Sequence, residues 1–281
     1  MSTVEAQVRD YYDSGGPAYE AFMGKFWHHG DADAESRGVS PEESAKALER
    51  QLVTAAGLRP GQWGLDFGAG VGGATVYMTQ ISGANFVGIS NNEWLSERAR
   101  EHAREQEMHE KVSFHTVGDL EYKTLNAWPD SCMDAVFFFE SVCHLPDKAA
   151  FFRAAARILR PRGHLLGVDW LQRPCGEYRT AEHIKQWMDP VERHIAIPWL
   201  GTVGQYRAMI EDAGLTVQIA EDMYAGQRCW GSTPPDDAQG WLTYNGPNAE
   251  RFHAGKRALD AARAAGVFTV GKFIATKPFN P

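Results

Sequence analysis

The chain has 281 residues, of which 43% are hydrophobic, and it carries a formal net charge of -8. A chain of this length and composition can bury a sizeable core and is most simply interpreted as one domain with embellishments. The acidic balance disfavours nucleic acid as a partner, because proteins that bind the phosphate backbone usually carry a basic patch.

No apolar run in the sequence is long enough to span a bilayer, and the first five residues lack the basic start and apolar stretch of a signal peptide. We therefore expect a soluble, cytoplasmic protein that does not insert into membranes. The cysteines are widely separated without a C-x-x-C motif, and no carboxylates or histidines cluster at ligand spacing, so we expect reduced thiols and no metal site. The cysteines are Cys132, Cys143, Cys175 and Cys229.

Residues 1–40 are rich in aromatic residues and glycine. Side chains at helical spacing predict a helix that ends at Gly15-Gly16-Pro17. Packing against the core explains any one of these aromatic residues, but their concentration, together with the pair His28-His29, is unusual for a leader segment. The residues at helical spacing are Val4, Val8, Tyr11 and Tyr12.

A second helix is predicted to begin at Ser40-Pro41. The serine is a capping residue, the proline suits the first helical position, and Glu43 closes a capping box. Apolar residues recur on one face until Gly57, which predicts the end of the helix. This helix is expected to be scaffold.

The stretch Leu65–Gly73 combines the end of a strand, a tight turn and the start of a helix. An apolar approach ends at Asp66, and glycines follow at positions 68, 70, 72 and 73. Glycine permits positive φ and lets a ligand contact the main chain, while the N–H groups at a helix start favour negative charge or oxygen acceptors. The turn therefore predicts a cofactor site, with a structural turn that binds nothing as the alternative.

Two kinds of cofactor fit this turn. Gly68, Gly70 and Gly73 satisfy the G-x-G-x-x-G pattern of dinucleotide-binding proteins. That pattern requires an acidic ribose ligand about 20 residues further on, where the sequence has Ser90-Asn91-Asn92. Asp66 suits a different arrangement, in which a carboxylate holds the N–H groups of the turn or lies near a cationic cofactor.

Six further strands are expected, and the third of them is apolar without alternation, as in a central parallel strand covered on both faces. Ser90 follows the first of them and has a second interpretation as a helix cap, since Ser90-x-x-Glu93 is a capping box. Asp119, after the second, has a second interpretation as a turn residue. The six strands are Phe86–Ile89, Val112–Thr116, Asp134–Phe139, His164–Trp170, Leu215–Ala220 and Phe268–Thr276.

Polar residues with catalytic chemistry follow the strand that ends at Phe139. Ligands of open α/β sheets bind beyond the carboxyl ends of the strands, which places Glu140 and His144 at a candidate site. A desolvated Glu140 can stabilise a developing cation or accept a proton, and His144 is a second candidate base. The alternatives are a structural hydrogen bond for Glu140 and an ordinary loop histidine for His144.

Two long segments interrupt the second half of the chain. Residues 171–207 hold many aromatic residues among prolines and glycines and are expected to form a second wall of a substrate pocket, with core packing as the alternative for each residue. Residues 223–266 separate the last two strands and are expected to shape the pocket or to make a contact between subunits.

Taken together, these motifs resemble the class I S-adenosylmethionine-dependent methyltransferases. Asp66-Phe67-Gly68-Ala69-Gly70 is similar to their D-x-G-x-G motif, and the other motifs arrive in the order of that family over residues 50–170. The resemblance implies an α/β, Rossmann-like fold with a mostly parallel seven-stranded sheet, an antiparallel last strand and helical lid segments. The N-terminal region resembles that of the tocopherol methyltransferase type, although Tyr19-Glu20 stands where Trp-Glu is expected. This resemblance implies that residues 1–40 form a lid over the substrate, ahead of a main domain over residues 41–281.

The resemblance also implies roles for individual residues. S-adenosylmethionine would lie on Asp66, on the turn and on Asp119, which would accept a hydrogen bond from the adenine amino group. Neutral side chains would replace the usual acidic ligand of the ribose. The implied cofactor residues are Asp66, Gly68, Ala69, Gly70, Ser90, Asn91, Asn92, Asp119, Leu120 and Glu140, and the candidate bases are Tyr12, His28, His29, Glu140 and His144.

We therefore expect methyl transfer to a small molecule of specialised metabolism, without a metal. Aromatic faces and a carboxylate favour carbon methylation of an electron-rich aromatic, indole or prenylated acceptor ahead of N- or O-methylation. One rival is a protein of the same fold that uses its pocket for cyclisation or ligand binding. Another is a nicotinamide oxidoreductase, which the missing ribose carboxylate disfavours.

Overall fold

The computed structural model describes residues 3–118, 124–176, 180–230 and 242–279. Its centre is a seven-stranded sheet with the order β3-β2-β1-β4-β5-β7-β6. Strands β1 to β5 are parallel to one another, and β7 runs antiparallel to both β5 and β6. This confirms the predicted fold class. The strands are β1 Trp63–Phe67, β2 Asn85–Ser90, β3 Val112–Thr116, β4 Met133–Phe139, β5 Leu159–Gln172, β6 Thr216–Asp222 and β7 Phe268–Thr276.

Helices cover both faces of this sheet. Phe137 and Phe139 of β4 point to the core shared with α3, α4 and α5, whereas Val136 and Phe138 point to the core shared with α7 and α9. Because both faces of β4 are buried, its sequence is continuously apolar, as predicted. These helices are α3 Pro41–Ala56, α4 Gly73–Ser82, α5 Glu93–Glu105, α7 Lys148–Ile158 and α9 Val203–Asp212.

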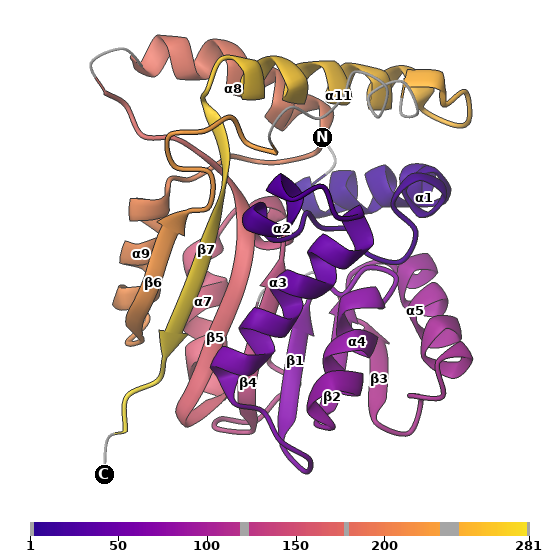
Figure 1. Cartoon of the computed structure of the whole chain (residues 1–281), viewed down its shortest axis with the longest axis vertical. Helices are drawn as coiled ribbons and strands as arrows, with labels where there is room; N and C mark the ends of the chain where they lie inside the picture. The colour runs from indigo at the N-terminus through magenta and orange to yellow at the C-terminus, as the bar shows by residue number, and fades with distance from the viewer. Residues whose placement is uncertain (1–2, 119–123, 177–179, 231–241, 280–281) are drawn as a thin grey trace.

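Four further helices gather at one end of the sheet (Figure 1). There α8 packs along α11, and Phe252 of α11 contacts the ring of Tyr11 in α1 with a centroid distance of 5.1 Å. The predicted insertions therefore contribute a helical layer that meets the N-terminal segment. The helices are α1 Val4–Met23, α2 Ala32–Ser36, α8 Ala181–His194 and α11 Ala249–Ala264.

The predicted caps of α3 are confirmed. The Ser40 side chain accepts a hydrogen bond from the N–H of Glu43, Pro41 occupies the first turn, and Gly57 ends the helix in the left-handed conformation. The alternative interpretation of Ser90 as a helix cap is wrong. Asn92 caps α5 instead, by accepting a hydrogen bond from the N–H of Leu95 at 3.0 Å.

The predicted end of the first helix at Gly15-Gly16-Pro17 is also wrong, because α1 continues to Met23. The two glycines serve close packing. A Cβ atom on Gly15 would lie 2.0 Å from the ring of Phe252, and one on Gly16 would lie 2.3 Å from the ring of Trp94. Contacts with α11 and α5 therefore offset the low helix propensity of this stretch.

None of the described helices combines the length and apolar character that a membrane span requires. Within the described ranges, no group of three histidine, cysteine or acidic side chains is arranged to hold a metal ion.

Candidate active site

A cavity lies where β1, β2 and β4 end. The glycine turn after β1 forms its floor, and the N-terminal segment, defined here as residues 3–40, forms its cover. Seven of the predicted cofactor residues line this cavity, namely Asp66, Gly68, Ala69, Gly70, Ser90, Asn91 and Glu140.

The glycine turn brings main chain, rather than side chains, to the cavity. Gly68 and Gly70 have φ values of 78° and 53°, in the left-handed region that favours glycine. Gly73 is required for another reason. A Cβ atom at this position would lie 2.0 Å from the carbonyl oxygen of Lys25, so no side chain fits there. The N-terminal segment is thus seated directly on the turn.

Asp66 is buried at the end of β1 and accepts a hydrogen bond from the Thr75 hydroxyl at 2.6 Å. Burial raises the pKa of Asp66 to about 7, although the bond from Thr75 acts in the opposite direction. A cationic ligand in the cavity would therefore stabilise the ionised form of Asp66.

The polar residues after β2 divide into two groups. Ser90 and Asn91 line the cavity. Asn92 is turned away from it, since its side chain caps α5 and donates a hydrogen bond to Asp13 of α1 at 2.6 Å. The predicted adenine residues Asp119 and Leu120 lie outside the described residues.

Glu140 faces the cavity from the end of β4 with a φ of 50°. The backbone N–H of His29 donates to its carboxylate at 3.0 Å, and the ring Nδ1 of His29 lies 3.3 Å from both oxygens. Burial alone would raise the pKa of Glu140, but the charges of His29 and His28 and the hydrogen bonds from His29 hold it below its usual value. The structure therefore contains an ionised carboxylate in an apolar surrounding.

His144 is placed by a short 3-10 helix, η1 Val142–His144. Its Nδ1 lies 3.2 Å from the carbonyl oxygen of Ala196, which can only accept, so Nδ1 carries the proton. Nε2 then accepts a hydrogen bond from the Tyr12 hydroxyl at 3.0 Å. Burial lowers the pKa of His144 to about 4, with the ammonium of Lys148 acting in the same direction. The ring is neutral at physiological pH, with its free lone pair toward Tyr12 and the cavity.

Lys148 also holds the turn that carries this histidine. Its side chain is fully buried, and Nζ donates to the carbonyl oxygens of Cys143 and Leu145 at 2.9 and 2.8 Å. The two residues that flank His144 are therefore fixed from one side, and Ala196 fixes the ring from the other.

The two adjacent histidines have different surroundings. Both ring nitrogens of His28 contact acceptors, Glu49 Oε1 at 2.7 Å and the carbonyl oxygen of His29 at 2.9 Å. His29 is 31% exposed and stacks on Trp230 with a centroid distance of 3.5 Å. Both ring nitrogens of His28 are thus used in contacts within the protein, whereas His29 contacts Glu140.

The structure thus brings Tyr12 and His144 into one pair and His29 and Glu140 into another at the same cavity. Sequence reasoning missed Trp27, which stacks on Tyr12 and lies 4.0 Å from the position of a Cβ atom on Gly70. It also missed Glu49 and Ala196. The adjacency of Trp27 to His28 was a usable signal, but an apolar alanine and a glutamate within a scaffold helix carried none.

Comparison with known proteins gives a consistent result. Residues 39–219 match a family described as a methyltransferase domain. The chain is 31% identical over 214 residues to the 27-O-demethylrifamycin SV methyltransferase of Amycolatopsis mediterranei (strain S699), with 75% of this chain and 74% of that protein covered.

Two plant relatives are matched over shorter parts of their length. The chain is 29% identical over 178 residues to the cycloartenol-C-24-methyltransferase of Arabidopsis thaliana, covering 63% of this chain and 51% of that protein. It is 32% identical over 173 residues to a protein of Oryza sativa subsp. japonica named "Probable tocopherol O-methyltransferase, chloroplastic", covering 59% of this chain and 47% of that protein.

Solved structures share the fold at low sequence identity. The [4+2]-cyclase SpnF superposes with a TM-score of 0.80 at 21% identity, covering 99% of this chain and 98% of that chain. A geranyl diphosphate C-methyltransferase from Streptomyces coelicolor A3(2), in complex with Mg2+, geranyl diphosphate and S-adenosyl-L-homocysteine, superposes with a TM-score of 0.71 at 14% identity, covering 98% of each chain.

Proposed function

This chain belongs to the class I S-adenosylmethionine-dependent methyltransferases that act on small molecules, and on that basis we propose that it methylates a carbon atom of an electron-rich aromatic, indole or prenylated acceptor of specialised metabolism. The observation that carries this proposal is the ionised Glu140, buried at the cavity beside the His29–Trp230 stack.

The residues present fit the cofactor. The turn from Gly68 to Gly70 offers main chain that a ligand can approach closely, Asp66 offers a buried carboxylate to an ammonium group, and Ser90 and Asn91 offer neutral polar groups to hydroxyls. When bound, S-adenosylmethionine supplies an electrophilic methyl group on a sulfonium. The protein then has to align the acceptor, exclude water and manage charge and protons.

Glu140 is suited to stabilise the positive charge that develops on the acceptor. A carbon nucleophile of a π system becomes cationic as it takes the methyl group, and a fixed carboxylate next to aromatic faces stabilises that cation in a site from which water is excluded. The cycloartenol relative, whose name describes methylation at a carbon, supports this assignment.

His144 is suited to accept the proton that the methylated acceptor loses. Its neutral ring keeps Nε2 unprotonated, and Ala196 and Lys148 hold it in place from opposite sides. A methylated cation regains neutrality by losing a proton, and Nε2, which lies 3.0 Å from the Tyr12 hydroxyl, is placed to accept it. Tyr12 holds the lone pair in place until the acceptor arrives.

A second candidate is O-methylation, which the Tyr12–His144 pair favours. A hydroxyl acceptor in place of the Tyr12 hydroxyl would give its proton to Nε2 as oxygen takes the methyl group. The rifamycin relative, whose name describes an O-demethyl substrate, supports this candidate. Under O-methylation Glu140 would matter much less, since no carbocation forms.

The first test is calorimetric titration with S-adenosylhomocysteine, beside NAD as a control. We expect micromolar binding, about -8 kcal/mol, for the former and none for the latter. The reverse result would contradict the proposal. Phenols, indoles, prenyl diphosphates and polyketide alcohols are then screened with labelled methyl donor, and the methylated atom is identified by NMR. Turnover of an acceptor to a cyclised product without label transfer would favour the cyclase rival.

Variants separate the two candidates. For carbon methylation we expect Glu140→Gln to lower kcat by about 10²–10³-fold, and His144→Gln to lower it by about 10²–10⁴-fold. For O-methylation only His144→Gln has the large effect. Tyr12→Phe should lower kcat and leave the affinity for S-adenosylhomocysteine within about threefold of wild type, since its hydroxyl contacts His144. Loss of cofactor affinity in folded Glu140→Gln and Tyr12→Phe proteins would contradict these roles.

A further inference from the structure

One buried polar contact ties the N-terminal segment to the scaffold helix α3. Nε2 of His28 lies 2.7 Å from Oε1 of Glu49, and the two side chains are 4% and 0% exposed. The other oxygen of Glu49 has no hydrogen-bond partner among the described residues. A carboxylate in this position is expensive to bury, so His28 is the group that compensates it.

The geometry requires a proton in this contact. Nδ1 of His28 lies 2.9 Å from the carbonyl oxygen of His29, which only accepts, so Nδ1 carries a hydrogen. If Nε2 were unprotonated, its lone pair would face a carboxylate oxygen at 2.7 Å. The short distance therefore requires one proton between Nε2 and Oε1. Burial raises the pKa of Glu49 and alone would lower that of His28, but the hydrogen bond and charge of Glu49 raise the pKa of His28 overall, so we assign the proton to an imidazolium that donates from both nitrogens.

The contact reaches Glu140 in two steps. His28 stacks on Phe139, the residue before Glu140, with a centroid distance of 4.6 Å. It also holds the carbonyl oxygen of His29, whose own N–H donates to Glu140. The orientation of the His28–His29 turn thus decides whether Glu140 receives its hydrogen bonds.

We propose that Glu49 is a positioning residue for methyl transfer, which holds the imidazolium of His28 and thereby closes the N-terminal segment over the cavity with His29 on Glu140. The meaning of this closure rests on the proposed function. Closure takes up one proton, because His28 exchanges water for a buried carboxylate.

The neighbouring charges favour the protonated form of His28. Burial alone would lower the pKa of His28, but the hydrogen bond and charge of Glu49, together with the charge of Glu140, raise it. Asp66 of β1 also faces His28. Lys46 and Arg50 face Glu49 from within α3. Since the pKa is raised in the closed state, the closed state is favoured at low pH and loses this contribution as pH rises through that pKa.

Two substitutions separate geometry from charge. The amide of Glu49→Gln donates to a neutral His28 Nε2 and so keeps the contact without an added proton. Glu49→Leu removes the contact. Glu42→Gln is the matched control, because Glu42 lies on the same helix with a side chain that is 59% exposed.

The first measurement is 15N NMR of the histidine side chains of the free protein, with His28 assigned from a His28→Gln variant. We expect both His28 nitrogens to be protonated at pH values where exposed histidines are neutral, and Glu49→Gln to abolish this state. A neutral His28 in the wild type at pH 7 overturns the proposal. This experiment needs neither cofactor nor acceptor, so its result is independent of the proposed function.

The second measurement is the affinity for S-adenosylhomocysteine between pH 6 and pH 9. Above the pKa of His28, wild type and Glu42→Gln should lose about tenfold in affinity per pH unit more than Glu49→Gln does, as expected for one linked proton. Glu49→Leu should bind weakly throughout. Equal pH slopes in wild type and Glu49→Gln would overturn the proposal, whereas absence of binding in all variants with a protonated His28 would count against the proposed function alone.

Discussion

Without a cationic partner, the folded protein disfavours the ionised form of Asp66. Its folded pKa of about 7 exceeds the usual aspartate value, so the unfolded chain ionises first as pH rises. Stability is therefore lost between about pH 4 and pH 7. We expect Asp66→Asn, which can still accept the Thr75 hydrogen bond, to raise the Tm of the ligand-free protein by roughly 5 °C at pH 8 and to weaken binding of S-adenosylhomocysteine.

Calorimetry over a pH series checks this expectation. The gain in Tm should vanish near pH 4, where the group is protonated in both states, and level off above pH 7. The exposed Asp10→Asn is the control and should leave the Tm within about 1 °C at every pH. A stabilised Asp66→Asn protein that binds S-adenosylhomocysteine as tightly as wild type would remove Asp66 from the cofactor site.

Packing, rather than local helix propensity, explains why helix α1 continues through its glycines. Gly16 lies against Trp94 of α5 without room for a Cβ atom. Alanine gains about 1 kcal/mol of helix propensity over glycine, but here the clash with the ring outweighs this gain. We expect Gly16→Ala to move α1 away from α5 and to weaken the affinity for S-adenosylhomocysteine about tenfold, as measured by calorimetry.

Gly204 provides the matched control. It lies in the first turn of α9, and a Cβ atom there would meet only the Thr202 hydroxyl at 4.0 Å. Gly204→Ala should therefore stabilise the protein by about 0.5–1 kcal/mol without changing affinity. If Gly16→Ala behaved in the same way as Gly204→Ala, the proposed role of this close contact in seating α1 would be wrong.

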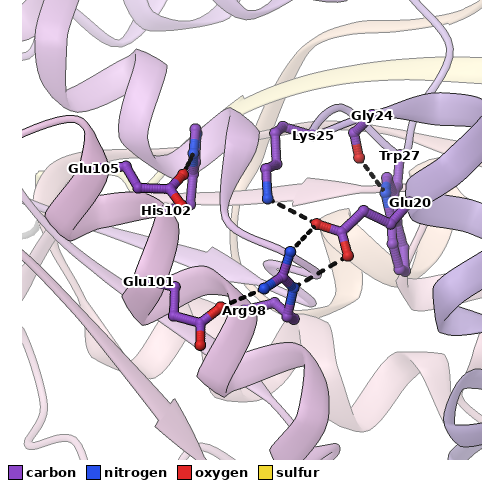
Figure 2. A network of polar contacts seen from close by, with 8 residues as sticks. All are labelled: Glu20, Gly24, Lys25, Trp27, Arg98, Glu101, His102 and Glu105. Carbon is purple, nitrogen blue, oxygen red and sulfur yellow. Dashed lines mark hydrogen bonds and ion pairs between the residues drawn. The ribbon is translucent and has the colours of Figure 1, made fainter.

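At the scale of the whole molecule, a polar network joins the end of α1 to α5 (Figure 2). Glu20 receives Arg98 of α5 at 2.6 and 3.1 Å and Lys25 at 2.7 Å. Burial alone would raise the pKa of Glu20, but its bonds to Arg98 and Lys25 lower it. Since Lys25 belongs to the stretch seated on the glycine turn, this network couples the part of the N-terminal segment next to that turn to α5.

We expect Glu20→Gln to weaken S-adenosylhomocysteine binding about threefold to tenfold, because the segment loses a charged tie to α5. At 1 M salt the difference from wild type should shrink, since screening weakens the partly exposed ion pairs. Glu101→Gln is the control, as Glu101 also contacts Arg98 but lies on the same helix. An equal effect of both variants would show that the network stabilises α5 alone.

Much of the fold was predictable because its signals are local. The Ser40 cap of α3, the apolar run from Ala135 to Phe139 in β4 and the glycines after Asp66 each act within a few residues of their own position. That the candidate residues gather at one cavity was predictable for a similar reason. Asp66 lies at the end of β1, Glu140 and His144 follow β4, and the carboxyl ends of parallel strands meet at one edge of the sheet.

The sequence alone thus determined the class of fold, the family and the place of the glycine turn. Only the tertiary structure decided which side chains work together. His28 on Glu49, His144 on Ala196 and Gly16 on Trp94 join segments far apart in the chain. The physical reason is that capping, periodicity and turn geometry depend on neighbouring residues, whereas burial, hydrogen-bond partners and pKa values depend on how distant elements pack.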